Sequence, residues 1–350
     1  MICPLLRAAR ARRAHLGLLM ICAQLVAPAA SARDQASGQV LKIGTMAPEN
    51  TLPHRALLKM AQIFDEETQG QVQLKIYPGT VGDEPTIVRK LRVGQLQGAL
   101  LSSKGLGNVS TEPIAMQLPM MFDSTAEIDA VLAQMQPTFD RALEADGLVP
   151  LAWSDGGWIY LFASEPAVSV VDMARRKMWM WPHDDGAVAS FASIGLQPVI
   201  LSDVDILPAL RTGMVEVFPG TPMTALALQT FPSTPHMVDV PIAFMLAAVV
   251  VDRSAWQRIP PQQRARILAR CQQGGAEMSA EVRRSNVEAL AILKTRGVVV
   301  HSPSPAQREA WRTAGARALE LARGRSVDAA LVDEVLRRRD AFRASHRSQP

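Results

Sequence analysis

The chain has few cysteines, few aromatic residues and little net charge. Three cysteines and 5 % aromatic residues occur in its 350 residues. Cys3 and Cys22 lie in the first 32 residues, which leaves Cys271 as the one cysteine beyond them. A single cysteine excludes an intramolecular disulfide, so the rest of the chain must be stabilised by a hydrophobic core.

The N-terminal segment has the layout of a secretory signal peptide. Four arginines over positions 7–13 precede an apolar stretch over 16–27, and Ala30–Ala32 supplies the small residues before a cleavage site. The apolar stretch is too short to span a bilayer as a helix. We therefore expect export to the periplasm through a cleavable signal. The bulky Ile21 before Cys22 argues against lipidation of that cysteine.

Removal of this segment would also remove the net charge. The whole chain has 37 Lys and Arg against 33 Asp and Glu, and the first 32 residues contain four Arg and no acid, so 33 of each sign remain. Such a balance gives no field to attract nucleic acid or anionic lipid. No later apolar run approaches the ~20 residues that cross a membrane. We expect an exported, soluble protein with no nucleic-acid partner.

Short strand patterns alternate with helical periods through the rest of the chain. Strands are predicted over 39–44, 72–76, 98–102, 148–153, 177–181, 197–201 and 215–218, with helices between them. This alternation predicts an α/β fold with parallel sheets covered by helices on both faces. An apolar strand over 242–251 is expected to return to the first unit. One amphipathic helix from Pro260 to Arg296, roughly 55 Å long, would brace both units.

Several segments, taken together, resemble one family of exported proteins. The chain is similar, in their order and spacing, to the substrate-binding subunits of tripartite ATP-independent periplasmic (TRAP) transporters, the DctP family. It resembles most the TatP branch, which works with a periplasmic tetratricopeptide-repeat protein. The matching segments are Leu41–Pro48 with His54, Lys75–Gly79, Gly82–Pro85, Val88–Gln95, Ile200–Asp203, Ala209–Val215 and Ala255–Pro260.

The resemblance implies a type II periplasmic binding protein fold. Two α/β lobes joined by hinge strands would close over one ligand, and the loaded protein would deliver it to the membrane permease subunits. The expected segments are a signal peptide (1–32), lobe I (33–153 and 238–275), lobe II (154–237 and 276–335) and a polar C-terminal tail (336–350) that frays.

The chain departs from the family where carboxylate-binding members use two arginines. Ile159 or its neighbour stands at one of these positions, and Trp179 aligns with the other. An arginine offers a planar fork of donors, whereas an indole offers one N–H and a large apolar face. The resemblance therefore implies a largely apolar ligand: a lipid, a long-chain or aromatic molecule, or a hydrophobic compound resembling an amino acid.

Nine residues make up the candidate ligand-binding set. The aromatic side chains are expected to form walls, and the others lie in loops after strands, where open α/β sheets place ligands. Trp179 and Trp181 share one face of a strand and fit a plain core equally well. The nine are Met46, Glu84, Ser102, Trp158, Tyr160, Trp179, Trp181, Phe218 and Thr221.

Structural alternatives exist for the polar members of this set. Glu84 could cap the helix that begins at Pro85, because acids favour helix N-termini. Ser102 could lie in a solvated loop, and Thr221 could simply start a helix. His54 is expected to be a structural hydrogen-bonding group, and Arg337–Arg339 a solvated helix face.

The sequence offers little for a metal, a cofactor or catalysis. The side chains of His183–Asp185 are adjacent and cannot easily converge on one ion. Gly105 and Gly107 lack the third glycine of a dinucleotide loop, and no nucleophile elbow or zinc-protease motif occurs. We therefore expect neither a metal nor a cofactor, and no enzyme.

Three competing functions remain beside delivery of an apolar ligand to a TRAP permease. The protein could be a periplasmic carrier of hydrophobic ligands or lipids that is independent of a permease. It could be a TRAP subunit for a small carboxylate. It could be an enzyme on the same scaffold, although no nucleophile, base and orienting group can be assembled from the sequence.

Overall fold

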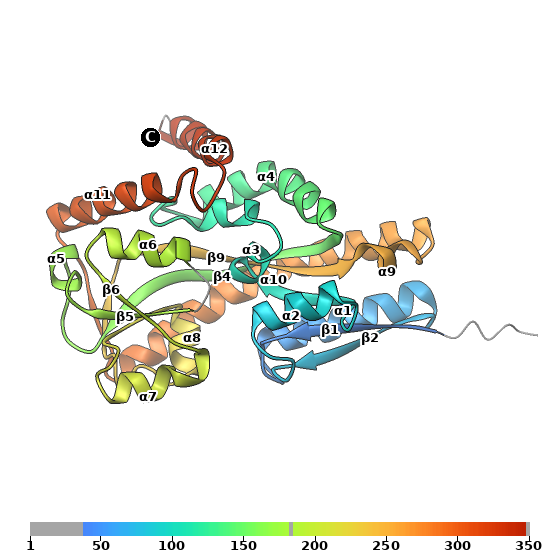
Figure 1. The fold of residues 1–350 in the computed structure, drawn as a ribbon, viewed down its shortest axis with the longest axis horizontal. Helices are drawn as coiled ribbons and strands as arrows, with labels where there is room; N and C mark the ends of the chain where they lie inside the picture. Colours follow the sequence, from blue (N-terminus) through green and yellow to red (C-terminus); the bar gives the residue numbers. More distant parts are fainter. Residues whose placement is uncertain (1–37, 182–184, 348–350) are drawn as a thin grey trace, which may run out of the picture. The chain divides into compact units, whose positions relative to one another are not determined.

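The computed structural model describes residues 38–181 and 185–347, drawn in colour in Figure 1. Residues 37–350 are grouped as one compact unit. The expected signal peptide, the lipidation question at Cys22 and the His183–Asp185 side chains all lie outside the described residues.

The chain begins with three parallel strands joined by helices. Leu41 and Ile43 of the first strand are buried, as their alternation predicts. The first strand pairs in parallel with the second and the third. The elements are β1 (Gln39–Thr45), α1 (Leu52–Thr68), β2 (Val72–Pro78), α2 (Glu84–Arg92) and β3 (Gly98–Ser102).

The middle of the chain contains one long strand. After α3 (Ser103–Gly107), η1 (Glu112–Gln117) and α4 (Thr125–Ala145), β4 runs for 16 residues from Leu148 to Ala163. The sequence predicts a strand only over 148–153 and places the start of a second unit near Asp155. The structure shows that this strand continues into a second group of elements.

That second group repeats the strand and helix alternation. Its strand β5 pairs in parallel with β6 and β7, and β7 pairs antiparallel with the end of β4. The elements are α5 (Val170–Met173), β5 (Lys177–Met180), α6 (Asp185–Ser193), β6 (Gln197–Ile200), η2 (Asp203–Asp205), α7 (Ile206–Arg211), β7 (Val217–Gly220), α8 (Pro222–Ala227) and β8 (His236–Val238).

The chain returns through β9 (Ala243–Asp252), which is antiparallel to both β3 and β4. The sheet order is β2-β1-β3-β9-β4-β7-β5-β6, with β8 and β10 beside this path. The predicted parallel pairing is found among β1 to β3 and among β5 to β7, whereas β4 and β9 run antiparallel to their neighbours. A strand that leads back from the second group to the first must run against β4, the strand that led there.

Four apolar clusters lie on the faces of this sheet. Two are built around β1 to β3, the start of β4 and β9, and two around β5 to β7 and the end of β4. We call the part of the molecule around the first two clusters the first lobe, and the part around the other two clusters the second lobe. Trp158 packs on a first-lobe cluster, whereas Ile159 and Tyr160 pack on second-lobe clusters, so β4 passes between the lobes directly after Trp158.

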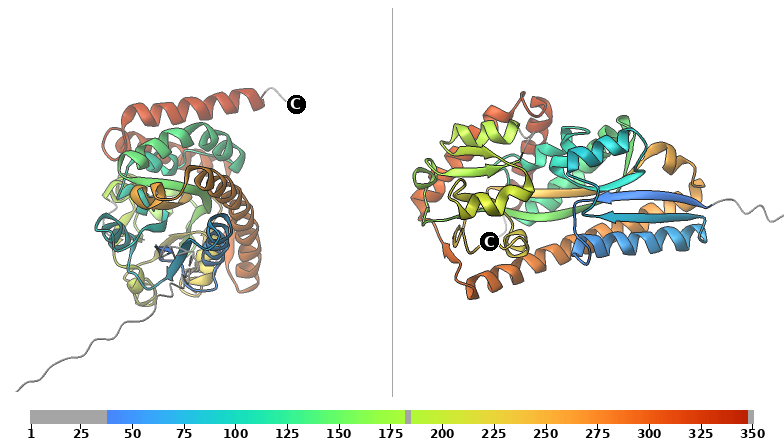
Figure 2. Two further views of the ribbon diagram at one scale, coloured as in Figure 1. Left: turned by 90° about the vertical axis from the view of Figure 1, so that its right-hand side faces the viewer. Right: turned by 60° about the horizontal axis from the view of Figure 1, so that its bottom comes forward.

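The long helix is α10 (Pro261–Thr295), which follows α9 (Arg253–Gln257). It packs along α1, β4 and α8, as the views in Figure 2 illustrate. Ile267 and Cys271 are buried in the first lobe and Leu293 in the second. This confirms the expected helix that braces both lobes.

The C-terminal end differs from the prediction. After β10 (Val299–His301) and α11 (Pro305–Ala322), residues 336–347 belong to a regular helix, α12 (Ala329–Arg347), and not to a frayed tail. Apolar residues between Leu319 and Val335 lie in the first-lobe core, although this segment was expected in the second lobe. The helix packs on α4 and η1.

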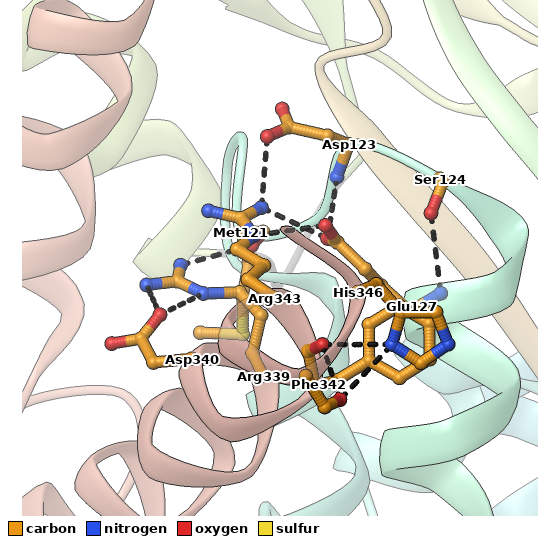
Figure 3. A network of polar contacts seen from close by, with 10 residues as sticks. Met121, Asp123, Ser124, Glu127, Arg339, Asp340, Phe342, Arg343 and His346 are labelled. Carbon is orange, nitrogen blue, oxygen red and sulfur yellow. Dashed lines mark hydrogen bonds and ion pairs between the residues drawn. The ribbon is translucent and has the colours of Figure 1, made fainter. Parts of the chain in front are cut away.

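Ion pairs hold α12 in place, as Figure 3 shows. Arg343 donates to both carboxylate oxygens of Glu127 at 2.8 Å and pairs with Asp123 at 2.9 Å. Arg339 donates to the Met121 carbonyl at 3.0 Å, so the arginine run is only partly a solvated face. Basic residues here bind the acidic N-terminus of α4 instead of facing solvent.

None of the helices in the described part of the chain combines the length and the apolar character of a membrane-spanning segment.

Candidate functional site

Four of the nine candidate ligand-binding residues lie at the carboxyl ends of strands, at the edges of the two lobes. Met46 and Ser102 lie at the carboxyl ends of β1 and β3, and Trp181 and Thr221 follow β5 and β7. Carboxyl ends of parallel strands share one edge of a sheet, which is where open α/β sheets place ligands.

One contact joins these edges across the lobes. The Lys104 Nζ of α3 lies 5.0 Å from the centre of the Trp181 ring, in a cation–π arrangement. Lys104 is the second residue after β3 of the first lobe, and Trp181 directly follows β5 of the second. Sequence reasoning missed Lys104, because its only signal was a place just beyond the end of a central strand.

The middle of β4, where this strand passes from one lobe to the other, contains two half-buried aromatic residues. Trp158 packs edge-on against Phe244, with ring centres 5.0 Å apart. Tyr160 pairs with Gly220, the residue before Thr221. Its hydroxyl has no hydrogen-bond partner in the part of the chain that the structure describes. Burial, and then the charge of Asp239, raise the pKa of Tyr160.

We use the name interlobe site for Lys104, Trp158, Tyr160 and Trp181. These four side chains come from both lobes and from the strand that joins them. Tyr160 and Trp181 pack against the same second-lobe cluster. Together they offer three half-buried aromatic side chains and one cation, with no guanidinium among the four.

Glu84 and Ser102 bind each other instead of standing open to a ligand. The buried Glu84 carboxylate accepts hydrogen bonds from the Ser102 N–H and Oγ, both at 2.6 Å. Burial raises the pKa of Glu84, although Ser102 and the charge of Lys104 oppose this shift. Asp83, not Glu84, caps α2, since its carboxylate accepts from Thr86. Ser102 is the N-cap of α3, so it does not lie in a solvated loop.

Trp179 and Phe218 lie in the core of the second lobe. Trp179 is 1 % exposed, and its indole N–H donates to the Leu201 carbonyl at 2.9 Å. Its ring stacks on Phe218 with centres 6.0 Å apart and lies 4.1 Å from the ring of Trp181. Trp179 is thus a core residue, which is the alternative that the sequence left open for Trp179 and Trp181. Only its neighbour Trp181 is half-buried at the lobe edge.

The remaining candidates have local structural roles or none. Thr221 is buried and forms a capping box with Thr224 at the start of α8. Met46 is 36 % exposed on the loop after β1. His54 Nδ1 accepts from the Asn50 N–H at 3.0 Å, which confirms its expected structural part.

No group of three or more His, Cys, Asp and Glu side chains suited to a metal ion occurs within residues 38–181 and 186–347, Asp203 aside. The expected His183–Asp185 segment falls outside that range. Cys271 is buried in α10, and burial raises the pKa of its thiol to about 12. A thiol with so high a pKa stays protonated and unreactive near neutral pH.

Comparison with known proteins gives one family. The model of "Bacterial extracellular solute-binding protein, family 7", called DctP, matches residues 43–323. The 2,3-diketo-L-gulonate-binding periplasmic protein YiaO of Escherichia coli (strain K12) is 21 % identical over 281 residues, which are 78 % of this chain and 84 % of that protein.

Solved structures share the fold. A TRAP periplasmic solute-binding protein of Ralstonia eutropha H16, with bound (S)-2-acetolactate, superposes with a TM-score of 0.78 at 20 % identity, covering 86 % of this chain and 99 % of that one. One from Desulfovibrio salexigens, with bound orotic acid, gives 0.79 at 19 % identity, covering 87 % and 99 %. The two lobes described above are therefore those of the TRAP periplasmic binding-protein fold, which confirms the predicted fold class.

Proposed function

Since the chain belongs to bacterial extracellular solute-binding protein family 7 and is a TRAP-type solute-binding protein, we propose that it binds a small, largely apolar acid in the interlobe site. The contact between Lys104 and Trp181 supports this proposal most directly. It places one cation beside an aromatic face where the lobes meet. We further propose that the protein has no enzymatic activity of its own.

The apolar part of the ligand follows from the aromatic side chains. Trp158, Tyr160 and Trp181 are half-buried, and Tyr160 adds one hydroxyl without a partner among the described residues. Ligand sites of this kind combine mostly apolar walls with a few polar groups that fix orientation. A sugar acid carries many hydroxyl groups and would leave most of them unpaired against these rings.

The acid group follows from the single cation. The E. coli relative is named for 2,3-diketo-L-gulonate, and the two similar structures hold acetolactate and orotic acid. In this chain the indole at position 179 lies in the core, and a lysine lies at the lobe edge. A lysine is a point charge without the fork of an arginine, so it suits one carboxylate on a simple body.

The first experiment is mass spectrometry of small molecules released by denaturing the gently purified protein. A stoichiometric apolar monocarboxylate would support the proposal, and a sugar acid or a dicarboxylate would contradict it. Calorimetric titration then compares 4-butylbenzoate with D-galacturonate. We expect tighter binding of the benzoate. Lys104→Gln should weaken that binding about tenfold or more, because hydrogen bonds to charged groups are the stronger ones.

We propose that the loaded protein delivers its ligand to TRAP membrane permease subunits. The rival proposal is a permease-independent carrier of hydrophobic ligands or lipids. Deleting the TRAP permease genes of the native cells separates the two. Uptake of the labelled ligand should stop if delivery is the function, and should continue if it is not. A tetratricopeptide-repeat partner, as in the TatP branch, stays a prediction that co-purification from the native cells would test.

Family members are periplasmic proteins, and we propose that this chain reaches the periplasm through the N-terminal signal. N-terminal sequencing of the protein from a periplasmic extract should then begin at Arg33, directly after Ala32. A chain that still carries residues 1–32 would contradict the proposed cleavage.

A further inference from the structure

A cavity of about 450 Å³ lies in the first lobe, between α1 and α10. The sheet forms its floor through β3, β4 and β9, whereas none of the interlobe-site residues lines it. Its size falls within the ~300–1,000 Å³ that ligand pockets occupy. Side chains that line it include Leu57, Met60, Leu100, Ala152, Ser154 and Met278.

Small residues on two elements create this space. Gly275 of α10 packs directly on the Trp153 carbonyl, because a Cβ there would lie 2.4 Å from that oxygen. The neighbouring Gly274 lines the cavity, and a Cβ placed on it would meet no atom within 4 Å. Ala152 and Ser154 are the small residues of β4 that line the floor. The helix therefore approaches the sheet closely at Gly275 and leaves room at the preceding residue, Gly274.

Ser154 gives the floor a polar group without a partner. The residue is only 8 % exposed and lines the cavity, and its Oγ forms no hydrogen bond with any described residue. The hydroxyl of Ser103, in contrast, bonds to the Leu246 backbone at 2.8 Å and 3.0 Å. A ligand with one hydrogen-bonding group would satisfy Ser154.

The charges stay at the rim of the cavity. Arg55, Lys59 and Arg284 are exposed there, and Arg284 forms an ion pair with Glu281. Glu277 accepts a hydrogen bond from Gln273 at 3.0 Å. The buried walls themselves carry no charged group, so an ionic group on a ligand would find no partner inside.

We propose that this cavity is a second ligand site, for a small apolar molecule that carries one hydroxyl or carbonyl group. Its apolar body lies between α1 and α10, and its polar group exchanges a hydrogen bond with Ser154. The proposal does not depend on the ligand of the interlobe site. Because α10 and β4 extend into both lobes, the occupant contacts two of the elements that connect them.

The test uses 4-butylphenol as a probe of the chain that begins at Arg33, with binding measured by calorimetry. We expect saturable binding at one site. Butylbenzene, which lacks the hydroxyl, should bind about tenfold more weakly, and Ser154→Ala should weaken the phenol to the same extent without changing butylbenzene. If Ser154→Ala and removal of the probe hydroxyl weaken binding equally, the affinity that is lost belongs to the hydrogen bond between Ser154 and the phenol.

Two further variants locate the probe. Gly274→Leu fills the cavity without a backbone clash and should abolish binding, whereas Gln272→Leu places the same side chain on the exposed side of α10 and should not. Trp181→Ala in the interlobe site should leave the phenol affinity unchanged. Absence of saturable binding, or binding that survives Gly274→Leu, would overturn the proposal. Loss with Trp181→Ala alone would place the phenol between the lobes and overturn it too.

Discussion

Asp155 of β4 and Arg283 of α10 form an ion pair at the point where β4 shifts its register against β9. Arg283 also donates to both carboxylate oxygens of Asp129 on α4, at 2.9 Å and 2.5 Å. The Ser279 hydroxyl accepts from the Asp155 N–H at 3.0 Å. One arginine thus connects the long helix, a first-lobe helix and the strand that leads into the second lobe.

This relationship predicts a large effect of Arg283→Met on stability. Asp155 has a side chain only 3 % exposed, and the variant would leave its carboxylate without its cation. Breaking a buried pair by removing one partner costs about 3–5 kcal/mol, and the partial exposure of Arg283 lowers our expectation to about 2–3 kcal/mol. Urea unfolding measures the loss.

The next residue along the helix supplies the matched control. Arg284 pairs with Glu281, and both side chains are exposed. Exposed pairs contribute little, so Arg284→Met should barely change the unfolding free energy. If the two variants are equally stable, the link from Arg283 to Asp155 does not hold the lobes' connection.

Glu84 predicts a pH dependence. Burial raises its pKa above the usual 4.5 in the folded protein. The Glu84 carboxyl group therefore contributes a stabilising free energy that is fully present below pH 4.5. This contribution is lost as the pH rises through the pKa that Glu84 has in the folded protein. Glutamine cannot ionise, so Glu84→Gln should gain stability relative to the natural protein between pH 4.5 and 7.5. Urea unfolding at several pH values measures this difference.

Asp83 gives a control of opposite sign. The hydrogen bond from Thr86 lowers the pKa of Asp83 below its usual 3.8. Its contribution is present above pH 3.8 and is lost as the pH falls through the folded pKa. Asp83→Asn should therefore be at its greatest disadvantage above pH 3.8, and the disadvantage should shrink in stronger acid. Parallel pH trends for the two variants would contradict the assignment of Glu84 as the buried acid.

Local sequence signals predicted most of the elements correctly. The alternation in β1 and the period of α10 each depend on neighbouring residues. The length of β4 and the antiparallel course of β9 depend on pairing between residues far apart in the chain. The acidic and glycine-rich middle of β4 carries no local signal of that pairing.

The sequence predicted where in the fold the candidate site lies, but not which residues belong to it. Strand ends pointed to the right edges, yet nothing local distinguishes Trp179 from Trp181. The structure separates them because the Leu201 carbonyl accepts from the Trp179 indole in the core. Lys104 and Ser154 gain their importance from elements remote in sequence, β5 and α10, so only the tertiary structure identifies them.

The ion pairs of α12 predict that its last turns stabilise the first lobe. Arg343 holds the nearly buried Glu127. Among the described residues, Arg343→Met would leave that carboxylate with the Asp123 N–H as its one donor (Figure 3). We expect a loss of about 1–2 kcal/mol in urea unfolding, since the arginine itself is partly exposed.

Arg337 of the same helix pairs with Glu334 in solvent and serves as the control. Arg337→Met should have little effect, and so should addition of salt to that variant. If Arg343→Met were as mild as Arg337→Met, the original expectation of a frayed C-terminal tail would be the better description of residues 336–347.

The two adjacent tryptophans predict separable effects on folding and binding. Trp179→Phe keeps an aromatic ring in the second-lobe core but loses the hydrogen bond to the Leu201 carbonyl. The variant should therefore cost about 1–3 kcal/mol of unfolding free energy. Binding of 4-butylbenzoate should stay unchanged. Trp181→Ala should cost less stability, because its side chain is half-buried, and should weaken binding severalfold through loss of the ring beside Lys104.

Trp179→Arg gives the sharpest form of this test. Introducing a charge at a fully buried position should prevent folding or cost more than about 4 kcal/mol, so the variant cannot restore a carboxylate clamp. Circular dichroism and titration with 4-butylbenzoate are therefore measured together. A folded Trp179→Arg protein that binds a dicarboxylate would show that Trp179 faces the ligand after all, and that its burial between Phe218 and Trp181 is not maintained in solution.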